Sequence, residues 1–563
     1  MKEELKKEIG SILKEMGIEN PKVNLDYAAR MEMGDYSSNV AMMYAKELGK
    51  NPFDLAEEIK HHLEAELPSG MDRVDIVKPG FINFFFDQGY FNSVIKEAQK
   101  ENYGKNKNLN GEKTIIEYTD PNPFKEFHIG HMMSNTIGES VSRIIESQGA
   151  KLKRANYQGD VGLQVAKAVW AMKKGQALLE AYAFGHKAYE EDESAKAEII
   201  EINKKIYDKS DDAINEIYED GRKKSLLYFE VLYNKLGTKF DYYFFESEVA
   251  EFGKETVEKN IGSVFEKSEG AIVFKGENFD RKLHTRVFIS SEGLPMYEAK
   301  ELGLSKIKYD SYPYDTSIII TANEISEYFR VLLKAMTLVF PELAQKTKHL
   351  SHGVIKLPEG KMSSRTGNII SAESLINQVK EKILTKMNSR FESERSEEGK
   401  YEAIATTEIA EIIAVGAIKY SILRQAIGGD IIFDFDKSIS FEGDSGPYLQ
   451  YSAVRAKSIL RKVESEKSKV ESGIPENWKT TNIERMIERF PSVVERAGSE
   501  YAPNYIATYL IELSSEFNSF YASHKIIDTE DPTSPYRLLI TQAFYNVMIS
   551  GLDLLGIKVP EKM

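Results

Sequence analysis

The stretch of sequence that decides the fold is EYTDPNPFKEFHIGH, residues 117–131. It overlaps the end of a short apolar run, TIIEY at 114–118, which predicts a buried strand. Beyond it, apolar residues recur at helical spacing between 133 and 144, and residues 153–157 predict the next strand. A strand, a loop, a helix and a second strand in this order form a βαβ unit, which implies a parallel sheet.

The loop in this stretch is suited to binding a nucleotide. In an open parallel sheet such a loop lies at the carboxyl edge of the strands, and the N–H groups of the following helix attract phosphate. Gly130 leaves room for a base or ribose against the backbone, and Lys125 adds a cation. The imidazoles of His128 and His131 can donate hydrogen bonds to phosphate oxygens. Taken alone, the two histidines also fit a structural turn or half of a zinc site, so the interpretation needs a second motif.

The second motif is KMSSRTGN at 361–368, preceded by PEG at 358–360. Two cations, several hydroxyl groups and flanking glycines describe a loop that can close on a triphosphate. Such a loop would stabilise the leaving pyrophosphate by position and charge. The composition alone would suit any surface loop, so the information lies in the order of the residues.

Composition limits the possible classes of protein. A length of 563 residues suggests about three or four domains. The absence of cysteine excludes disulfides, thiol catalysis and cysteine-ligated zinc, and with nine histidines we expect no structural metal. The net charge of −14 does not exclude a nucleic-acid partner, because binding depends on the local field. No apolar run approaches a membrane span and the N-terminus lacks a secretion signal, so we expect a cytoplasmic protein without membrane attachment.

The two motifs together resemble the signature pair of class I aminoacyl-tRNA synthetases. The resemblance implies activation of an amino acid by ATP, followed by its transfer to tRNA. It assigns ATP binding to His128, Gly130 and His131, and to the loop residues Lys361, Met362, Ser363, Ser364 and Arg365. The usual second lysine of that loop is missing, so the triphosphate contacts would rest on Lys361 and Arg365, with Lys125 compensating. The expected catalytic residues are thus His128, His131, Lys361 and Lys125.

Longer matches resemble arginyl-tRNA synthetases and run in order along nearly the whole chain. They are the segments 117–131, 156–164 (NYQGDVGLQ), 294–303 (LPMYEAKELG), 433–436 (FDFD), 446–451 (GPYLQY) and 552–557 (LDLLGI). The implied substrates are L-arginine, ATP and the tRNA for arginine, with Mg²⁺ brought by the ATP phosphates and no zinc. The family typically needs bound tRNA before it activates arginine. We also expect a monomer.

The resemblance also assigns an arginine site. Glu117 and Asn122 would face the α-amino and carboxylate end of the substrate, with His128 close to the reacting carboxylate. A guanidinium is planar and always charged, so a carboxylate is its natural partner.

Tyr297 and Glu301 would meet the guanidinium, although the family usually has Asp at the second position. Glu324 stands where many relatives carry Gln, and it could supply another carboxylate. As an alternative, Glu298, Glu301 and Glu324 are ordinary solvated acids.

The expected fold class is α/β, with a Rossmann-type parallel-sheet catalytic domain. This domain covers 105–440, with a helical insertion at about 173–236. An N-terminal α+β domain, 1–104, is expected to contact the tRNA elbow, with Asn39 as a participant. A C-terminal all-α helical bundle, 441–563, resembles the anticodon-binding domain of the family.

The C-terminal region carries candidate RNA contacts. The cations Arg455, Lys457, Arg461 and Lys462 form a run without acidic residues, which suits phosphate. Aromatic residues at helical spacing are Tyr509, Phe517, Phe520 and Tyr521. They could stack on anticodon bases, but such a stripe is more often core.

Two other functions remain possible at this stage: a class I synthetase for another amino acid, and a non-catalytic RNA-binding paralogue.

Overall fold

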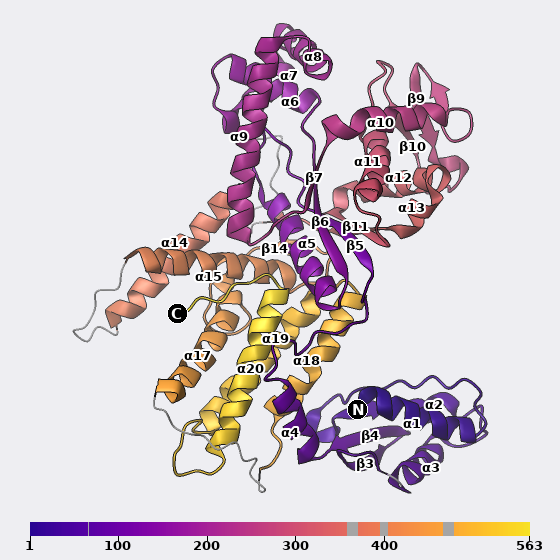
Figure 1. The fold of residues 1–563 in the computed structure, drawn as a ribbon, viewed down its shortest axis with the longest axis vertical. Coiled ribbons are helices and arrows are strands. Elements are labelled where there is room, and N and C mark those ends of the chain that lie inside the picture. Colours follow the sequence, from indigo (N-terminus) through magenta and orange to yellow (C-terminus); the bar gives the residue numbers. More distant parts are fainter. Residues whose placement is uncertain (66, 357–369, 394–402, 466–477) are drawn as a thin grey trace. The chain divides into compact units, whose positions relative to one another are not determined.

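A computed structural model describes residues 1–65, 67–356, 370–393, 403–465 and 478–563 (Figure 1). The chain divides into two compact units. The first comprises residues 1–104, 455–492 and 512–550, and the second comprises residues 105–454, 493–511 and 551–563. In the described part of the chain, no helix has the length and apolar character needed to cross a membrane.

The second unit is built on a five-stranded parallel sheet in the order β12-β11-β5-β6-β7. Its strands are β5 (Lys113–Glu117), β6 (Lys151–Gln158), β7 (Tyr242–Phe245), β11 (Thr316–Ala322) and β12 (Thr347–His352). The chain starts at β5, adds β6 and β7 on one side, and later adds β11 and β12 on the other. This is a doubly wound Rossmann arrangement, which opens a ligand crevice at the carboxyl ends of β5 and β11. The predicted α/β fold and its βαβ unit are confirmed.

Helix α5 (Ile129–Ser147) joins β5 to β6 and packs on the sheet. Its apolar positions Met133, Ile137, Val141 and Ile144 are buried, as their spacing predicted. The helix therefore presents one face to the sheet, and its N-terminus lies beside the crevice.

A group of four helices follows β6: α6 (Leu163–Lys173), α7 (Leu178–Glu191), α8 (Glu193–Asp208) and α9 (Asp212–Leu236). They pack around a small core of their own, which includes Val165, Ile199 and Ile214. Figure 1 shows them side by side, in purple and magenta.

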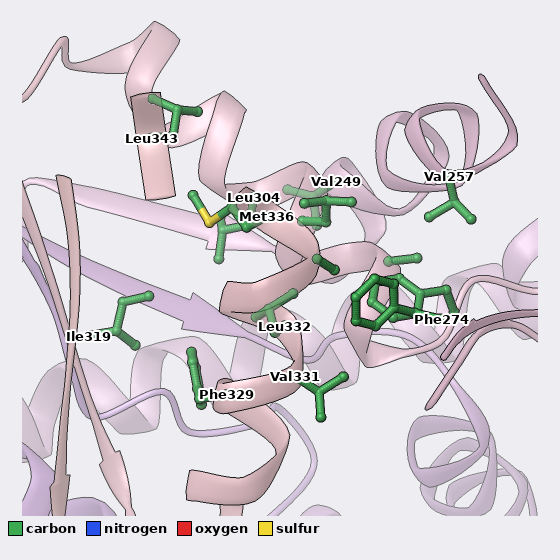
Figure 2. Close-up of a cluster of buried hydrophobic side chains, with 14 of the residues drawn as sticks. Val249, Val257, Phe274, Leu304, Ile319, Phe329, Val331, Leu332, Met336 and Leu343 are labelled. Atoms are coloured by element: carbon green, nitrogen blue, oxygen red, sulfur yellow. The ribbon is translucent and has the colours of Figure 1, made fainter. Parts of the chain in front are cut away.

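The segment between β7 and β12 forms a second layer of helices with a small antiparallel sheet. The helices are α10 (Glu246–Lys259), α11 (Tyr297–Ser311), α12 (Ser326–Val339) and α13 (Pro341–Lys346), and the sheet comprises β8 (Glu266–Ser268), β9 (Ala271–Lys275) and β10 (Thr285–Ile289). In Figure 2, Phe329 and Leu332 of α12 lie between Ile319 of β11 and Val249 of α10. This core packs α10, α11 and α12 against the parallel sheet, where it includes Ile115 of β5 and Ile319 of β11.

The remaining elements of the second unit are α14 (Ala372–Ser393), α15 (Ala403–Leu423), α16 (Phe435–Ser438) and the parallel pair β13 (Ile355–Lys356) and β14 (Ile431–Ile432). Beyond residue 441 the described elements are helices, as predicted: α17 (Gly446–Ser465), α18 (Asn482–Ser499), α19 (Asn504–Ser523) and α20 (Ser534–Leu554).

The N-terminal part of the first unit packs helices on an antiparallel sheet in the order β1-β2-β4-β3. The strands are β1 (Asp26–Tyr27), β2 (Tyr36–Ser38), β3 (Met71–Val77) and β4 (Phe81–Phe86), and the helices are α1 (Lys2–Glu15), α2 (Val40–Tyr44), α3 (Pro52–Ala65) and α4 (Gln88–Glu97). Pro52 is the first residue of α3, and β3 and β4 form an antiparallel hairpin. Asp35 holds this part to α18 through an ion pair with Arg485 at 2.6 Å.

Candidate active site

The start of α5 is built by its two histidines. The Nδ1 atom of His128 accepts hydrogen bonds from the backbone N–H groups of Gly130 at 3.1 Å and His131 at 3.4 Å. The Nδ1 atom of His131 accepts from the N–H of His128 at 3.2 Å, which closes a reciprocal capping box. The two rings stack with centroids 3.6 Å apart. A Cβ atom at Gly130 would lie 2.9 Å from the His128 ring, so this arrangement requires glycine.

This geometry sets the charge and tautomer of both rings. Burial lowers the pKa of His128 to about 4 and that of His131 well below its usual value, with Lys125 contributing to both. Both imidazoles are therefore neutral at pH 7. Because each Nδ1 accepts a backbone N–H, the proton of each neutral ring is on Nε2. The cap thus supplies two Nε2–H donors at the carboxyl edge of the sheet, where they can serve phosphate oxygens.

The loop between β5 and α5 is held in an unusual conformation. Three non-glycine residues have positive φ: Thr119 at 83°, Asp120 at 46° and Phe124 at 67°. Asp120 fixes the loop to β6, because its Oδ1 accepts the backbone N–H of Tyr157 at 2.8 Å. Such strain persists only where surrounding contacts enforce it, and it is typical of ligand-binding loops.

Lys125 projects from this loop towards the inserted helices. Its ammonium lies 3.3 Å from Oε1 of Gln164 on α6 and 4.4 Å from the ring centre of Tyr182 on α7. Burial and the neighbouring Lys167 lower the pKa of Lys125 to about 8. Lys125 therefore lies close enough to His128 for its charge to act on that ring.

A cluster of amides surrounds Gly159, directly after β6. Oδ1 of Asn122 accepts the N–H of Gly159 at 2.9 Å. A Cβ atom at Gly159 would lie 2.6 Å from Asn122, 3.0 Å from Gln164 and 3.0 Å from Glu246. Gly159 therefore allows Asn122, Gln164 and Glu246 to converge at one point of the sheet edge.

Glu117, the last residue of β5, is buried and paired. Its Oε2 binds the ammonium of Lys308 on α11 at 2.6 Å, and both side chains are 2% exposed. No described residue donates a hydrogen bond to Oε1. The predicted contact of Glu117 with a substrate would therefore use the second oxygen of a carboxylate already paired with lysine.

Glu301 lies on the same helix as Lys308 and makes no hydrogen bond or ion pair within the described residues. Burial, followed by the negative charges of Glu117 and Asp120, raises the pKa of its carboxyl well above the usual value. Lys308 acts in the opposite direction but does not offset these effects. A carboxyl whose pKa is raised by neighbouring acids is stabilised in its charged form when a cation binds beside it.

The two other predicted guanidinium contacts differ in their surroundings. Tyr297 begins α11, and its hydroxyl donates to Oε1 of Gln164 at 3.4 Å. Gln164 thus links the expected arginine contact Tyr297 to the expected ATP contact Lys125. Glu324 follows β11 and is exposed, so in this structure it has the surroundings of a solvated acid. Glu298, by contrast, is buried and lies 3.5 Å from Arg286.

Sequence reasoning missed Glu246, which is the first residue of α10 and follows β7 immediately. It is buried and pairs with Lys300 at 2.6 Å. The rule that ligands bind at the carboxyl ends of parallel strands could have found it. The pairing of Lys300 and Lys308 with carboxylates far away in the sequence carried no local signal.

The expected ATP contacts Lys361, Met362, Ser363, Ser364 and Arg365 lie outside the described residues.

The candidate RNA residues are only partly accessible. Tyr521 on α19 is 43% exposed, and its ring lies 5.7 Å from the guanidinium of Arg455. Phe517 has no exposed surface and stacks on Phe544, and Tyr509 is 4% exposed. A side chain enclosed in its core cannot stack on a base, so the core alternative describes Phe517 and Tyr509. Asn39 occupies the N-cap position of α2 without a side-chain capping bond and is half-buried. Lys457 is half-buried, while Arg461 and Lys462 are exposed.

Comparison with known proteins identifies the family to which this fold belongs. The model "tRNA synthetases class I (R), catalytic domain" matches residues 93–435. The models "Arginyl tRNA synthetase N terminal domain" and "DALR anticodon binding domain" match residues 2–86 and 449–563. The doubly wound sheet, with the histidine cap formed by His128 and His131, is thus that of a class I aminoacyl-tRNA synthetase. Within this class, the chain belongs to the arginyl-tRNA synthetase family.

Curated relatives agree along the full length. The arginine–tRNA ligase of Fusobacterium nucleatum subsp. nucleatum is 32% identical over 572 residues, which covers 96% of this chain and 95% of the relative. That of Clostridium acetobutylicum is 29% identical over 558 residues, with 96% of each chain covered.

Solved structures show the same fold. The arginyl-tRNA synthetase of Thermus thermophilus is 24% identical with a TM-score of 0.76, and all of both chains is covered. That of Plasmodium falciparum is 21% identical with a TM-score of 0.80, covering 100% of this chain and 99% of the other.

Proposed function

We propose that this chain activates L-arginine with ATP to arginyl-adenylate and pyrophosphate, and then transfers arginine to the 3′ end of its tRNA. Family membership supports this reaction. The structural observation that carries the assignment of the site is Glu301, a carboxyl with no hydrogen bond or ion pair among the described residues, on the helix that also bears Lys308, the partner of Glu117.

In the first step, an oxygen of the arginine carboxylate attacks the α-phosphorus of ATP, and the bond to the bridging oxygen of the β-phosphate breaks. The Nε2–H groups of His128 and His131 donate to oxygens on which negative charge develops. Lys125 neutralises part of the triphosphate charge. By their motif, Lys361, Met362, Ser363, Ser364 and Arg365 stabilise the departing pyrophosphate.

The backbone end of arginine is held at the loop after β5. Oε1 of Glu117 accepts from the α-ammonium, while Lys308 keeps Oε2 and limits the cost of burying the carboxylate. The Asn122 amide contacts the same end of the substrate, and His128 lies near the reacting carboxylate. Orientation of the two substrates supplies most of the rate acceleration, because the nucleophile is the carboxylate of the substrate itself.

The guanidinium points towards α11, where Glu301 and Tyr297 contact it. Glu324, which follows β11, also contacts it. The planar fork of N–H groups matches a carboxylate in a way that a point-charge ammonium cannot. Lysine would leave buried acceptors unpaired, which discriminates far more strongly than the loss of a methylene group.

In the second step, a hydroxyl of the terminal tRNA ribose attacks the arginyl carbonyl, and AMP leaves. We propose that Arg455, Lys457, Arg461 and Lys462 contact tRNA phosphates. We propose that Tyr521 stacks on a base of the tRNA and that Asn39, in the N-terminal part, also contacts the tRNA. Phe517 and Tyr509 are not retained, because they are buried.

Mg²⁺ would enter with the ATP phosphates. In the described part of the chain, no three His, Asp or Glu residues come together as potential ligands. The phosphates and water would therefore supply most of its ligands, as is usual for this cation. We further propose that the protein acts as a cytoplasmic monomer, which light scattering coupled to gel filtration would test for its oligomeric state.

The deciding experiment is ATP–pyrophosphate exchange with each of the twenty amino acids, with and without transcribed tRNA for arginine. We expect exchange with arginine alone among them, and only when tRNA is present. Exchange driven by another amino acid would indicate a different class I synthetase. No exchange with arginine and tRNA together would indicate a non-catalytic RNA-binding protein.

A further inference from the structure

Two tyrosine hydroxyls at the candidate site are buried without a hydrogen-bond partner in the described part of the chain, those of Tyr157 and Tyr328. Tyr157 lies near the carboxyl end of β6 and is 8% exposed. Tyr328 lies on α12, where it meets the ring of Phe329 edge-on at 5.2 Å. Both rings belong to the core shown in Figure 2 or pack against it. Since buried polar groups are nearly always hydrogen-bonded, two such hydroxyls at one site call for an explanation.

The surroundings of both hydroxyls are acidic. After burial, the charges that most raise the pKa of Tyr157 are those of Glu246 and Glu301. For Tyr328 the leading charge is that of Glu301, and Arg286 is the opposing cation. Tyr328 is also among the neighbours that raise the pKa of Tyr157, so the two hydroxyls share one environment.

The missing partner must therefore be a hydrogen-bond donor that is favoured by nearby negative charge. A hydroxyl that donates its proton to a carboxylate still has lone pairs, which only an N–H or O–H donor can satisfy. Acidic neighbours favour a cation over a neutral donor. A guanidinium meets both conditions, because it carries five N–H groups in one plane, directed at several acceptors at once.

We propose that the hydroxyls of Tyr157 and Tyr328 are specificity-determining contacts, which accept hydrogen bonds from the guanidinium group of arginine beside Glu301. This assignment rests on the proposed function of the site and adds two residues to it. An ammonium is a compact charge whose three N–H groups diverge from one atom, so it matches acceptors spread over a plane less well than a guanidinium does. The two tyrosines thereby contribute to the rejection of lysine.

The test uses Tyr157→Phe and Tyr328→Phe in the full-length chain, assayed by ATP–pyrophosphate exchange with tRNA present. We expect KM for arginine to rise about tenfold in each variant, the loss expected for one hydrogen bond to a charged donor. The values of kcat and of KM for ATP should stay within about twofold, because the substitution is remote from the phosphates. The preference for arginine over lysine should fall by a similar factor.

Thermal unfolding separates this role from a structural one. Removing a buried hydroxyl that has no partner should not lower Tm of the free protein. The rise of Tm on adding saturating arginine with tRNA should be smaller in both variants, because ligand stabilisation follows affinity.

The matched control is Tyr314→Phe. Tyr314 is buried in the same core, but its hydroxyl donates to the carbonyl of Ser305 at 3.3 Å. This variant should lower Tm and leave KM for arginine unchanged. The proposal is overturned if Tyr157→Phe and Tyr328→Phe behave like the control, or if they leave KM for arginine unchanged. A wild-type chain that does not exchange with arginine would instead refute the proposed function.

Discussion

Burial and the negative charges of Glu117 and Asp120 raise the pKa of the Glu301 carboxyl well above its usual value. The other groups around it are Lys308 on the same helix, Glu246 at the start of α10, and the hydroxyls of Tyr157 on β6 and Tyr328 on α12. Only Lys308 among these favours the carboxylate, and it is already paired with Glu117. An arriving guanidinium would therefore act with Lys308, favour the carboxylate and lower this pKa.

This arrangement predicts that arginine binds more tightly as the pH rises. The bound cation favours the carboxylate and lowers its pKa, so binding releases a proton at pH values below the raised pKa of the free protein. KM for arginine should fall with rising pH, and calorimetry in two buffers of different ionisation enthalpy should detect proton release. A KM that does not depend on pH would contradict this prediction.

Glu301→Gln provides the control for this linkage. It should raise KM for arginine and remove most of its pH dependence; an unchanged KM would refute the guanidinium contact. In the free protein, the raised pKa means that ionisation of Glu301 opposes folding. Stability is therefore lost as the pH rises from the ordinary carboxyl pKa to the raised one. The Gln variant should consequently show a higher Tm than the wild type above that interval.

Gly130 makes the histidine cap possible, which leads to a second prediction. A methyl group at this position would meet the His128 ring at 2.9 Å and push it from the helix terminus. Gly130→Ala should therefore lower kcat for exchange by about 100-fold, as expected when an aligned donor is lost. Gly10→Ala is the control, since its methyl group would meet Val23 at an ordinary 3.9 Å within a helix. That control should retain activity and gain up to about 1 kcal/mol from helix propensity.

At the level of elements, the inserted helices determine the charge of Lys125. Gln164 of α6 and Tyr182 of α7 enclose its ammonium, and burial lowers its pKa to about 8. The cation is present below this pH and is lost above it. Since kcat/KM reports ionisations of the free enzyme, kcat/KM for ATP should decline above about pH 8.

Lys125→Arg tests this assignment, because a guanidinium keeps its charge throughout the range. The alkaline decline should disappear in the variant, even if its kcat/KM is lower at neutral pH. Persistence of the same decline would assign it to another group. Tyr182→Leu should move the decline rather than remove it.

The elements that bear the site differ in how far the sequence predicts them. The βαβ unit and its loop at 117–131 follow from local periodicity, and the structure has them. The order of strands in the sheet does not follow from local periodicity, because β11 pairs with β5 although many other elements separate the two strands in the sequence. The residues of a strand do not specify which other strand pairs with it in parallel.

Long-range pairs at the site were invisible for the same reason. Nothing near Glu117 indicates that Lys308 would neutralise one of its oxygens, and nothing near Tyr328 indicates that the charge of Glu301 would raise the pKa of its hydroxyl. Helical spacing predicted that Tyr509, Phe517 and Tyr521 share a helix, but spacing cannot say which face is buried. The structure exposes Tyr521 and encloses the other two.

At the scale of the whole chain, the C-terminal end of α20 and the residues that follow it belong to the second unit. The hydroxyl of Ser140 donates to the carbonyl of Leu554 at 2.9 Å, and Arg143 pairs with Asp553 at 2.6 Å. Both Ser140 and Arg143 lie on α5, the helix that begins at the histidine cap. The last residues of the chain thus stabilise the helix that carries the nucleotide-binding turn.

Lys419 completes this attachment from α15. Its buried ammonium donates to the carbonyls of Leu236, at the end of α9, at 2.6 Å and of Gly556 at 2.7 Å. Burial lowers its pKa to about 7, far below that of a lysine in the unfolded chain. The unfolded state therefore binds more protons between pH 7 and the ordinary lysine range, and the free energy of unfolding should rise with pH across that interval.

Lys419→Met should reduce that rise, because it removes the titrating group. It should also destabilise the second unit by about 1–3 kcal/mol per carbonyl left without a donor. Denaturant unfolding at pH 7 and pH 9 would measure both effects. Lys437→Met is the control, since this lysine is 82% exposed and should leave the slope unchanged. Equal slopes in the wild type and Lys419→Met would show that Lys419 is charged throughout, held as an ammonium by its two carbonyls against the cost of burial.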